Sequence, residues 1–326
     1  MSTTYDSHNL RSLFVSLHSI DRLLIAFWGL LSLLSLILHA GMPAWRIIVA
    51  ANLAAACVTC ALALAARASR LRPVRWMHDW ACFPLVVFTY KEIYFIVRMI
   101  HHGRDYDSLL IAIDRALFGI NPTQWLAHFA NPYLTEVLQI AYSLFYVLFV
   151  AVGLELYRKK DLYQFGYFRL TVVYGFFLSY IGYFTLPAVG PRFTLHDFSA
   201  IDTEMPGLLL TPYLRWFVNI FESIPAGATS SAALALAQRD VFPSGHTMLT
   251  LITVALAYKF KLRIRHCVMG TGSLLIIATV YLRYHYVIDI VAGALLALPC
   301  LLSADKIFRL FKGSADGVEP PARMQP

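Results

Sequence analysis

The amino-acid sequence predicts an all-α, polytopic membrane protein, a bundle of about eight transmembrane helices. Three observations point to this fold: charged residues make up only 14% of the 326 residues, hydrophobic residues make up 59%, and apolar runs recur along the chain. A soluble domain carries about 25% charged residues, so this chain has too little charge to be solvated by water alone. A helix that crosses a bilayer needs roughly 20 mostly apolar residues, and several runs reach that length.

The apolar runs define eight expected spans. They cover residues 22–40, 45–66, 80–100, 133–156, 166–187, 244–260, 266–283 and 285–303. Charged side chains, among them Lys91, interrupt the third run. Almost no linker separates the last two runs, which predicts a tight corner between them. The first run lacks a small-residue cleavage site, so we interpret it as a retained span rather than a signal peptide.

Clusters of lysine and arginine predict the orientation of these spans. With eight spans, four clusters fall on the same side of the membrane. They contain Arg67, Arg70, Arg72 and Arg75; Arg158, Lys159 and Lys160; Lys259, Lys261, Arg263 and Arg265; and Lys306, Arg309 and Lys312. The positive-inside rule makes that side the cytoplasm, with both termini there. The net charge of +8 is therefore a topology signal, and we expect no nucleic acid partner.

The sequence predicts a single catalytic region within the membrane protein. Residues 1–132 are expected to form N-terminal spans and an outer interfacial segment, residues 133–312 a catalytic core, and residues 313–326 a disordered tail. The five cysteines have neither disulfide nor metal-site spacing, so we expect them to be packing residues. No cofactor is expected. The absence of eukaryotic sorting signals predicts a bacterial inner membrane, with the site facing the periplasm.

Three short motifs converge on the outer side in this topology. The first, residues 190–192, follows the fifth span and ends in Arg192. The second, residues 243–246, reads Pro-Ser-Gly-His and opens the sixth span. The third, residues 283–289, occupies the corner between the last two spans. Each motif alone has an ordinary structural explanation, but three on one face indicate a site.

The two histidines suit phosphoryl transfer. Residues four apart on a helix share a face, so Asp289 is expected to accept a hydrogen bond from one imidazole nitrogen of His285. The other nitrogen is then left as a directed nucleophile. His246 can act as a general acid toward the leaving oxygen.

Five further residues are expected to bind the phosphate. Ser244 suits a helix N-cap, Gly245 permits a close approach of the ligand, and a helix N-terminus favours an anion. Arg192 and Arg283 can offer forked donors to the equatorial oxygens. Lys91, a lysine inside a span, is a functional candidate by default.

These motifs resemble the type 2 phosphatidic acid phosphatase superfamily of membrane lipid phosphatases and phosphotransferases. The resemblance covers about residues 133–303 and implies an all-helical core of the six-helix type that needs no metal. It also implies that His285 is the nucleophile, His246 the general acid and Asp289 the orienting carboxylate.

The sequence departs from the usual motifs at two positions. Thr185 stands where the first motif has a lysine, and Thr279 stands where the third has an arginine. With the stretch 281–286 and the segment around Asp114, these changes resemble the inositol phosphorylceramide synthase-like (inositolphosphotransferase) branch. That branch transfers a phospho-headgroup between lipids.

The missing lysine leaves a gap in phosphate binding. Lys91 and Arg98, seven residues apart on one face of the third span, are candidates to fill it. The alternative is that Lys91 pairs with a carboxylate of the bundle, Glu155 or Glu136. The sequence does not decide between these two interpretations.

The predicted activity is a lipid phosphatase or phospho-headgroup transferase that forms a phosphohistidine on the outer face. Its expected partners are the bilayer, a phospholipid or polyprenyl phosphate as substrate, and a second lipid as a potential acceptor. The alternative is an eight-span transporter or channel, which intramembrane charges would suit. Against it, the sequence has no pair of broken spans in matching halves.

Overall fold

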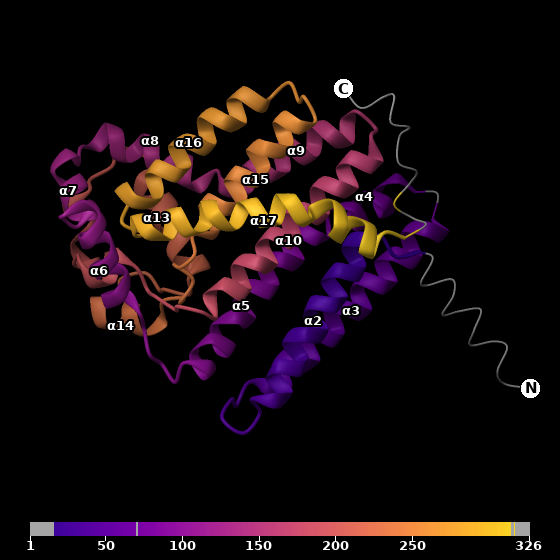
Figure 1. The fold of residues 1–326 in the computed structure, drawn as a ribbon, viewed down its shortest axis with the longest axis horizontal. Coiled ribbons are helices and arrows are strands. Elements are labelled where there is room, and N and C mark those ends of the chain that lie inside the picture. The colour runs from indigo at the N-terminus through magenta and orange to yellow at the C-terminus, as the bar shows by residue number, and fades with distance from the viewer. Residues whose placement is uncertain (1–15, 70, 314–315, 317–326) are drawn as a thin grey trace, which may run out of the picture. The chain divides into compact units, whose positions relative to one another are not determined.

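The protein is described from a computed structural model that covers residues 16–69, 71–313 and 316. Within these residues every regular element is a helix, which confirms the all-α fold (Figure 1). Arg70 and most of the tail predicted at 313–326 lie outside the described residues.

The chain divides into two compact units. The first unit takes residues 1–99, 153–177 and 300–326, and the second takes residues 100–152 and 178–299. The boundaries fall within four helices, so α5 (Cys82–Ile100), α9 (Phe145–Arg158), α10 (Leu162–Tyr183) and α17 (Val287–Phe311) contribute residues to both units.

The first unit begins with four consecutive helices. They are α2 (Ser19–Ile37), α3 (Trp45–Ala68), α4 (Arg72–Trp80) and α5 (Cys82–Ile100). Helices α2 and α3 lie side by side as a hairpin (Figure 1). Trp28 of α2 is buried, and its indole N–H donates to the hydroxyl of Thr89 at 2.9 Å, so the buried donor has a partner.

The second unit holds the elements that build the site. Its helices, with those shared, are α6 (Asp107–Phe118), α7 (Pro122–Leu126), η1 (Ala127–Phe129), α8 (Pro132–Ser143), α9 (Phe145–Arg158), α10 (Leu162–Tyr183), α11 (Pro191–Thr194), η2 (Phe198–Ala200), α12 (Ile201–Glu204), α13 (Thr211–Phe221), α14 (Ser230–Leu236), α15 (Gly245–Lys259), α16 (Arg265–Tyr281) and α17 (Val287–Phe311).

Several helices are long and apolar enough to cross a membrane, so the protein is a multi-pass membrane protein. Among the described residues four candidate spans are α2, α3, the stretch Arg72–Ile100 and α17. Helices α8 and α9, which are bent by 51° relative to each other, form a fifth candidate if they count as one span. The spans predicted at 166–187, 244–260 and 266–283 form α10, α15 and α16. Helices α15 and α16 are short, and α10 carries Arg169 and five tyrosines. The count of eight therefore stays a prediction.

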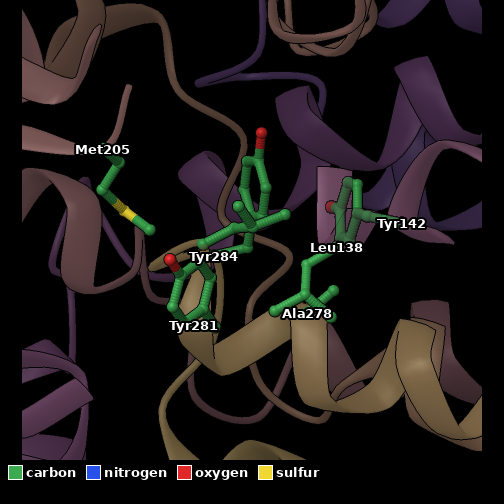
Figure 2. Packing of buried hydrophobic residues seen from close by; sticks show 7 residues of the cluster. Leu138, Tyr142, Met205, Ala278, Tyr281 and Tyr284 are labelled. Carbon is green, nitrogen blue, oxygen red and sulfur yellow. The ribbon is translucent and has the colours of Figure 1, made fainter. Parts of the chain in front are cut away.

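A core cluster of the second unit surrounds the end of α16. Figure 2 shows Ala278 and Tyr281 of α16 with Tyr142 of α8, Met205 and Tyr284. The rings of Tyr142 and Tyr284 stack with their centroids 4.3 Å apart. This packing fixes the position of Tyr284, the residue directly before His285.

Glu136 ties the chain before α13 to α8. Its carboxylate accepts hydrogen bonds from the amides of Leu208 at 2.9 Å and Leu210 at 2.6 Å, and from the hydroxyl of Thr211 at 2.7 Å. Helix α13 has no cap of its own, so Glu136 satisfies the amides at its start. Glu155, the other partner considered for Lys91, forms an ion pair with Lys159 at 3.2 Å.

Candidate active site

The corner between α16 and α17 presents His285. The carbonyl of Thr279 accepts hydrogen bonds from the amides of Tyr284 at 2.9 Å and His285 at 3.0 Å. Arg283 turns the chain with a φ of +69°, in the left-handed region that costs a non-glycine residue about 1–2 kcal/mol. The predicted tight corner is confirmed, but His285 lies before α17 rather than on one helix with Asp289.

Asp114 of α6 caps the helix that follows this corner. Its two carboxylate oxygens accept hydrogen bonds from the amides of Val287 and Ile288, each at 2.9 Å. These amides belong to the first turn of α17, where a helix has no internal acceptors and favours negative charge. A residue far away in the sequence therefore sets where α17 begins.

Asp107, on the same helix, holds the first motif. Its carboxylate accepts hydrogen bonds from the amides of Val189 at 3.1 Å and Gly190 at 2.8 Å, and from the hydroxyl of Tyr286 at 2.8 Å. Sequence reasoning missed this role. The available signal was the spacing of Asp107 and Asp114, since seven residues place both on one face of α6.

The start of α15 is packed tightly within the second unit. Ser244 is the N-cap, as predicted, and its hydroxyl accepts a hydrogen bond from the amide of Thr247 at 3.2 Å. The amide of Ser244 donates to the carbonyl of Asp289 at 2.9 Å. A Cβ on Gly293 would come within 2.4 Å of the Ser244 carbonyl, and one on Gly245 within 2.6 Å of a tyrosine hydroxyl. Glycine is needed where the chain segments approach so closely.

The two histidines face each other. Nε2 of His285 lies 3.5 Å from Nδ1 of His246, a long separation for a hydrogen bond. The ring of His246 is sandwiched by aromatic side chains, with centroids 4.7 Å from Tyr142 and 4.3 Å from Phe145. Residues 39 positions apart in the sequence thus meet at one point, as the motifs predict.

The other nitrogen of His285 has a backbone partner. Nδ1 lies 3.0 Å from the carbonyl oxygen of Val241, and Oδ2 of Asp289 is farther away at 3.5 Å. A carbonyl only accepts, so Nδ1 carries the proton and Nε2 keeps its lone pair. Asp289 instead accepts a hydrogen bond from the amide of Tyr286 at 2.7 Å. The hydrogen bond expected from His285 to Asp289 is replaced by one to Val241.

Burial keeps the imidazole of His285 neutral. It lowers the pKa of His285 to about 4, although Asp240, the Val241 carbonyl and Glu222 oppose the shift. A neutral imidazole with an unprotonated Nε2 is the nucleophilic form of histidine.

Arg192 supplies the cation of the site. Its side chain is buried and forms an ion pair with Glu222, and it donates to the amide oxygen of Asn219 at 3.3 Å. The guanidinium lies over the ring of Tyr284, 4.9 Å from its centroid. Its backbone amide donates to the carbonyl of Arg283 at 3.0 Å, which joins the first motif to the third.

These residues enclose a small space, which we name the histidine hollow. It is lined by Tyr142, Val189, Arg192, Glu222, Asp240, Val241, His246, Tyr284 and His285. Its volume is about 20 Å³, enough for about one water molecule. The space is narrow, and Arg192 and its partner Glu222 both line it.

Four of the predicted phosphate-binding residues do not line the hollow. Arg283 is buried and pairs with Glu204 of α12. Ser244 and Gly245 are buried in the packing between helices. Lys91 belongs to α5 of the first unit, where its ammonium lies over the ring of Tyr90, and its role stays a prediction.

Sequence reasoning missed two carboxylates of the hollow. Glu222 follows directly after α13, and Asp240 lies three residues before the Pro-Ser-Gly-His motif. The position of Asp240 beside the motif was a usable signal. Nothing local marks Glu222, because its partner Arg192 is 30 residues away.

The fold and the hollow define a class: a multi-pass, all-helical membrane protein with two histidines and an arginine at one buried site. A family model described as the PAP2 superfamily matches residues 108–302, well over half of the chain. The chain therefore belongs to the PAP2 superfamily, which confirms the resemblance at that level and indicates phosphatase or phosphotransferase activity. No curated protein and no solved structure matches it.

The match includes every residue of the three motifs and Asp114 of α6. Among the described residues, no three histidine, cysteine or acidic side chains gather as a metal site would require. The expected metal independence stays a prediction, to be checked with chelators.

Proposed function

We propose that the protein is a lipid phosphatase or phospho-headgroup transferase that acts through a phosphohistidine at His285. The observation that carries this proposal is the single free nitrogen of His285, Nε2, which faces both His246 and the interior of the histidine hollow. A nucleophile with a fixed tautomer, next to a second imidazole, is the arrangement that covalent catalysis needs.

The reaction has two balanced steps. In the first, Nε2 of the neutral His285 attacks the phosphorus, the bond to the leaving oxygen breaks, and the imidazolium form of His246 gives that oxygen a proton and becomes neutral. In the second, water or a lipid hydroxyl attacks the phosphorus, the phosphorus–nitrogen bond breaks, and His246 accepts the proton. Arg192 stabilises the charge on the equatorial oxygens in both steps.

The substrate phosphate must displace Glu222. Arg192 is paired with Glu222, and the hollow of about 20 Å³ leaves no room for a second anion. An incoming phosphate offers the same kind of acceptor to the same guanidinium, so exchange of one for the other opens the site.

Transfer to a lipid acceptor fits the departures from the usual motifs. Thr279 is fully buried, and its carbonyl builds the corner that holds His285. An arginine there would have to place its charge in this packed interior. Thr279 itself supplies no cation for phosphate, and the proposal of transfer rests on the resemblance of this departure to the inositolphosphotransferase-like branch.

The proposed setting is a bacterial inner membrane with the hollow on the periplasmic side. The basic clusters support it, because the positive-inside rule assigns their side to the cytoplasm. A cysteine placed at Thr203 in the outer segment should react with a membrane-impermeant maleimide in intact cells. Reaction only after the cells are opened would contradict this orientation.

Product analysis tests the activity. Purified protein in detergent is given phosphatidic acid, phosphatidylinositol or a polyprenyl diphosphate, with and without diacylglycerol or ceramide, and lipid products are identified by mass spectrometry. We expect release or transfer of a phosphate group that His285→Ala abolishes. His266→Ala, at an exposed histidine of α16, should behave as the parent. Turnover that persists in His285→Ala would rule out the phosphohistidine.

A further inference from the structure

A second cavity lies wholly within the first unit. Its volume is about 240 Å³, larger than the roughly 150 Å³ cavity that accepts a benzene molecule in another protein. We name it the Arg169 cavity. Its polar wall consists of His18, Arg75, His78, Asp79, Arg169 and Asp316. None of these residues lines the histidine hollow.

Arg169 is the buried cation of this cavity. Its side chain is 2% exposed, and one terminal nitrogen donates to the carbonyl of Asp79 at 2.5 Å. The other terminal nitrogen lies 3.5 Å from Nδ1 of His18. Its Nε is buried without a hydrogen-bond partner. One terminal nitrogen also pairs with the Asp79 carboxylate at 3.5 Å, and an anion in the cavity would add a second charged acceptor for the terminal nitrogens.

The carboxylates of the cavity are already bound by protein donors. Asp316 accepts hydrogen bonds from the amide and hydroxyl of Ser19, each at 2.9 Å. Asp79 accepts one from the hydroxyl of Tyr157 at 3.1 Å and lies beside Arg169. These contacts reduce the repulsion that the two acidic groups would exert on an anion.

The remaining polar groups favour an anion. Arg75 lines the same cavity, and its guanidinium donates to the exposed carbonyl of Ser69 at 3.2 Å, a contact that water can replace. His78 is bound by Asp21 at 2.9 Å. The unit also carries the basic cluster at residues 158–160, which raises the local concentration of anions.

The apolar wall indicates that the anion is attached to a lipid. Leu162, Phe165 and Gly166 of α10 line the cavity beside the charged groups. Leu162 is 60% exposed at the start of this helix, where the apolar wall begins. The cavity places two guanidinium groups, Arg75 and Arg169, beside this apolar wall, and guanidinium groups between membrane helices can bind anionic headgroups. We propose that the Arg169 cavity binds the phosphate-bearing headgroup of a membrane lipid, as a site separate from the histidine hollow.

Gly166 allows the cavity to be filled without removing a charge. A Cβ on Gly166 would meet no atom within 4 Å, so Gly166→Leu projects into open space. Leucine also favours a helix over glycine by roughly 0.5–1 kcal/mol, so this variant should fold. Gly29→Leu is the matched control, because Gly29 is a helical glycine of the same unit with equally open surroundings and lies outside the cavity.

The test is native mass spectrometry on the delipidated full chain. Phosphatidylglycerol, phosphatidylethanolamine and inorganic phosphate are titrated separately. We expect the parent, Gly29→Leu and His285→Ala to retain one phospholipid each, with little retention of inorganic phosphate. Gly166→Leu should lose lipid affinity about tenfold or more, and Arg75→Gln about tenfold, as expected for one charge-assisted hydrogen bond.

Two outcomes would overturn the proposal. Lipid affinity in Gly166→Leu equal to the parent would mean that the bound lipid lies elsewhere. Retention of inorganic phosphate as tight as that of either phospholipid would mean that the cavity takes a free anion. Because the readout is binding and His285→Ala is included, the proposal can fail while the proposed catalytic function stands.

Discussion

At His285 a backbone carbonyl fixes the tautomer of the imidazole, a role usually assigned to a carboxylate. Val241 fixes the tautomer from 3.0 Å, while Asp289 stands at 3.5 Å from the same nitrogen and holds the Tyr286 amide. Before reaction the imidazole is neutral and gains little from the acid. In the proposed reaction Nε2 comes to carry a phosphoryl group and the ring becomes cationic, and the carboxylate of Asp289 would stabilise that charge.

Replacing Asp289 by asparagine should therefore slow the enzyme without disturbing its tautomer. The asparagine oxygen can still accept from the Tyr286 amide, but the charge is lost. We expect kcat to fall roughly 10²-fold, at the lower end of the effect of an acid–base group, with KM little changed. Steady-state kinetics on a phosphatidic acid analogue measures both. A loss as complete as that of His285→Ala would show that Asp289, and not Val241, controls the tautomer.

The burial of His285 also predicts the acid limit of the reaction. Only the unprotonated ring attacks phosphorus, and burial lowers the pKa of His285 to about 4. The reactive form is thus present above that pH and lost as the pH falls through it. A profile of kcat/KM against pH should keep its acid limb near pH 4. An acid limb near 6.5, the ordinary histidine value, would mean that the ring is solvated in the working enzyme.

At the scale of elements, α6 organises the site although it contributes no side chain to the hollow. Asp107 binds the amides of the first motif, and Asp114 binds those at the start of α17. The two loops that carry Arg192 and His285 are therefore positioned by the same helix.

Asp114→Ala should destabilise the second unit by removing this cap. Loss of an N-cap acceptor costs about 0.5–2 kcal/mol, so we expect a lower midpoint of thermal unfolding and a loss of activity as the corner loosens. Leu117→Ala, at an exposed position of the same helix, is the control. If Asp114→Ala and Leu117→Ala have the same midpoint of thermal unfolding, α6 does not stabilise the start of α17 in this way.

The sequence predicts the parts of the site that depend on local patterns. The N-cap at Ser244 and the tight corner before His285 follow from residues that are neighbours in the chain. The partners of Arg192 and Arg283 do not, because Glu222 and Glu204 are 30 and 79 residues away. A sequence pattern does not indicate which residues so far apart in the chain are close in space. Both arginines were accordingly expected to face phosphate alone.

At the scale of the whole molecule, composition and charge patterning predict a membrane protein, and the family match supports the chemistry. What they do not predict is a resting site in which the arginines are already paired. The chain between α10 and α15 brings Glu222 to Arg192 and Glu204 to Arg283, so carboxylates occupy the two guanidinium groups expected to receive phosphate. Only the first of these pairs lines the histidine hollow.

Glu222→Gln should therefore tighten the binding of phosphate analogues. Glutamine keeps a hydrogen-bond acceptor for Arg192 but removes the charge that competes with the ligand. We expect the inhibition constant of vanadate to fall about tenfold, a gain of ~1.4 kcal/mol, together with a lower KM for lipid phosphate. Glu204→Gln is the matched control, because it removes the same charge from a pair outside the hollow and should leave the inhibition constant unchanged. Weaker vanadate binding in Glu222→Gln would show that this carboxylate holds Arg192 in position for the ligand instead of competing with it.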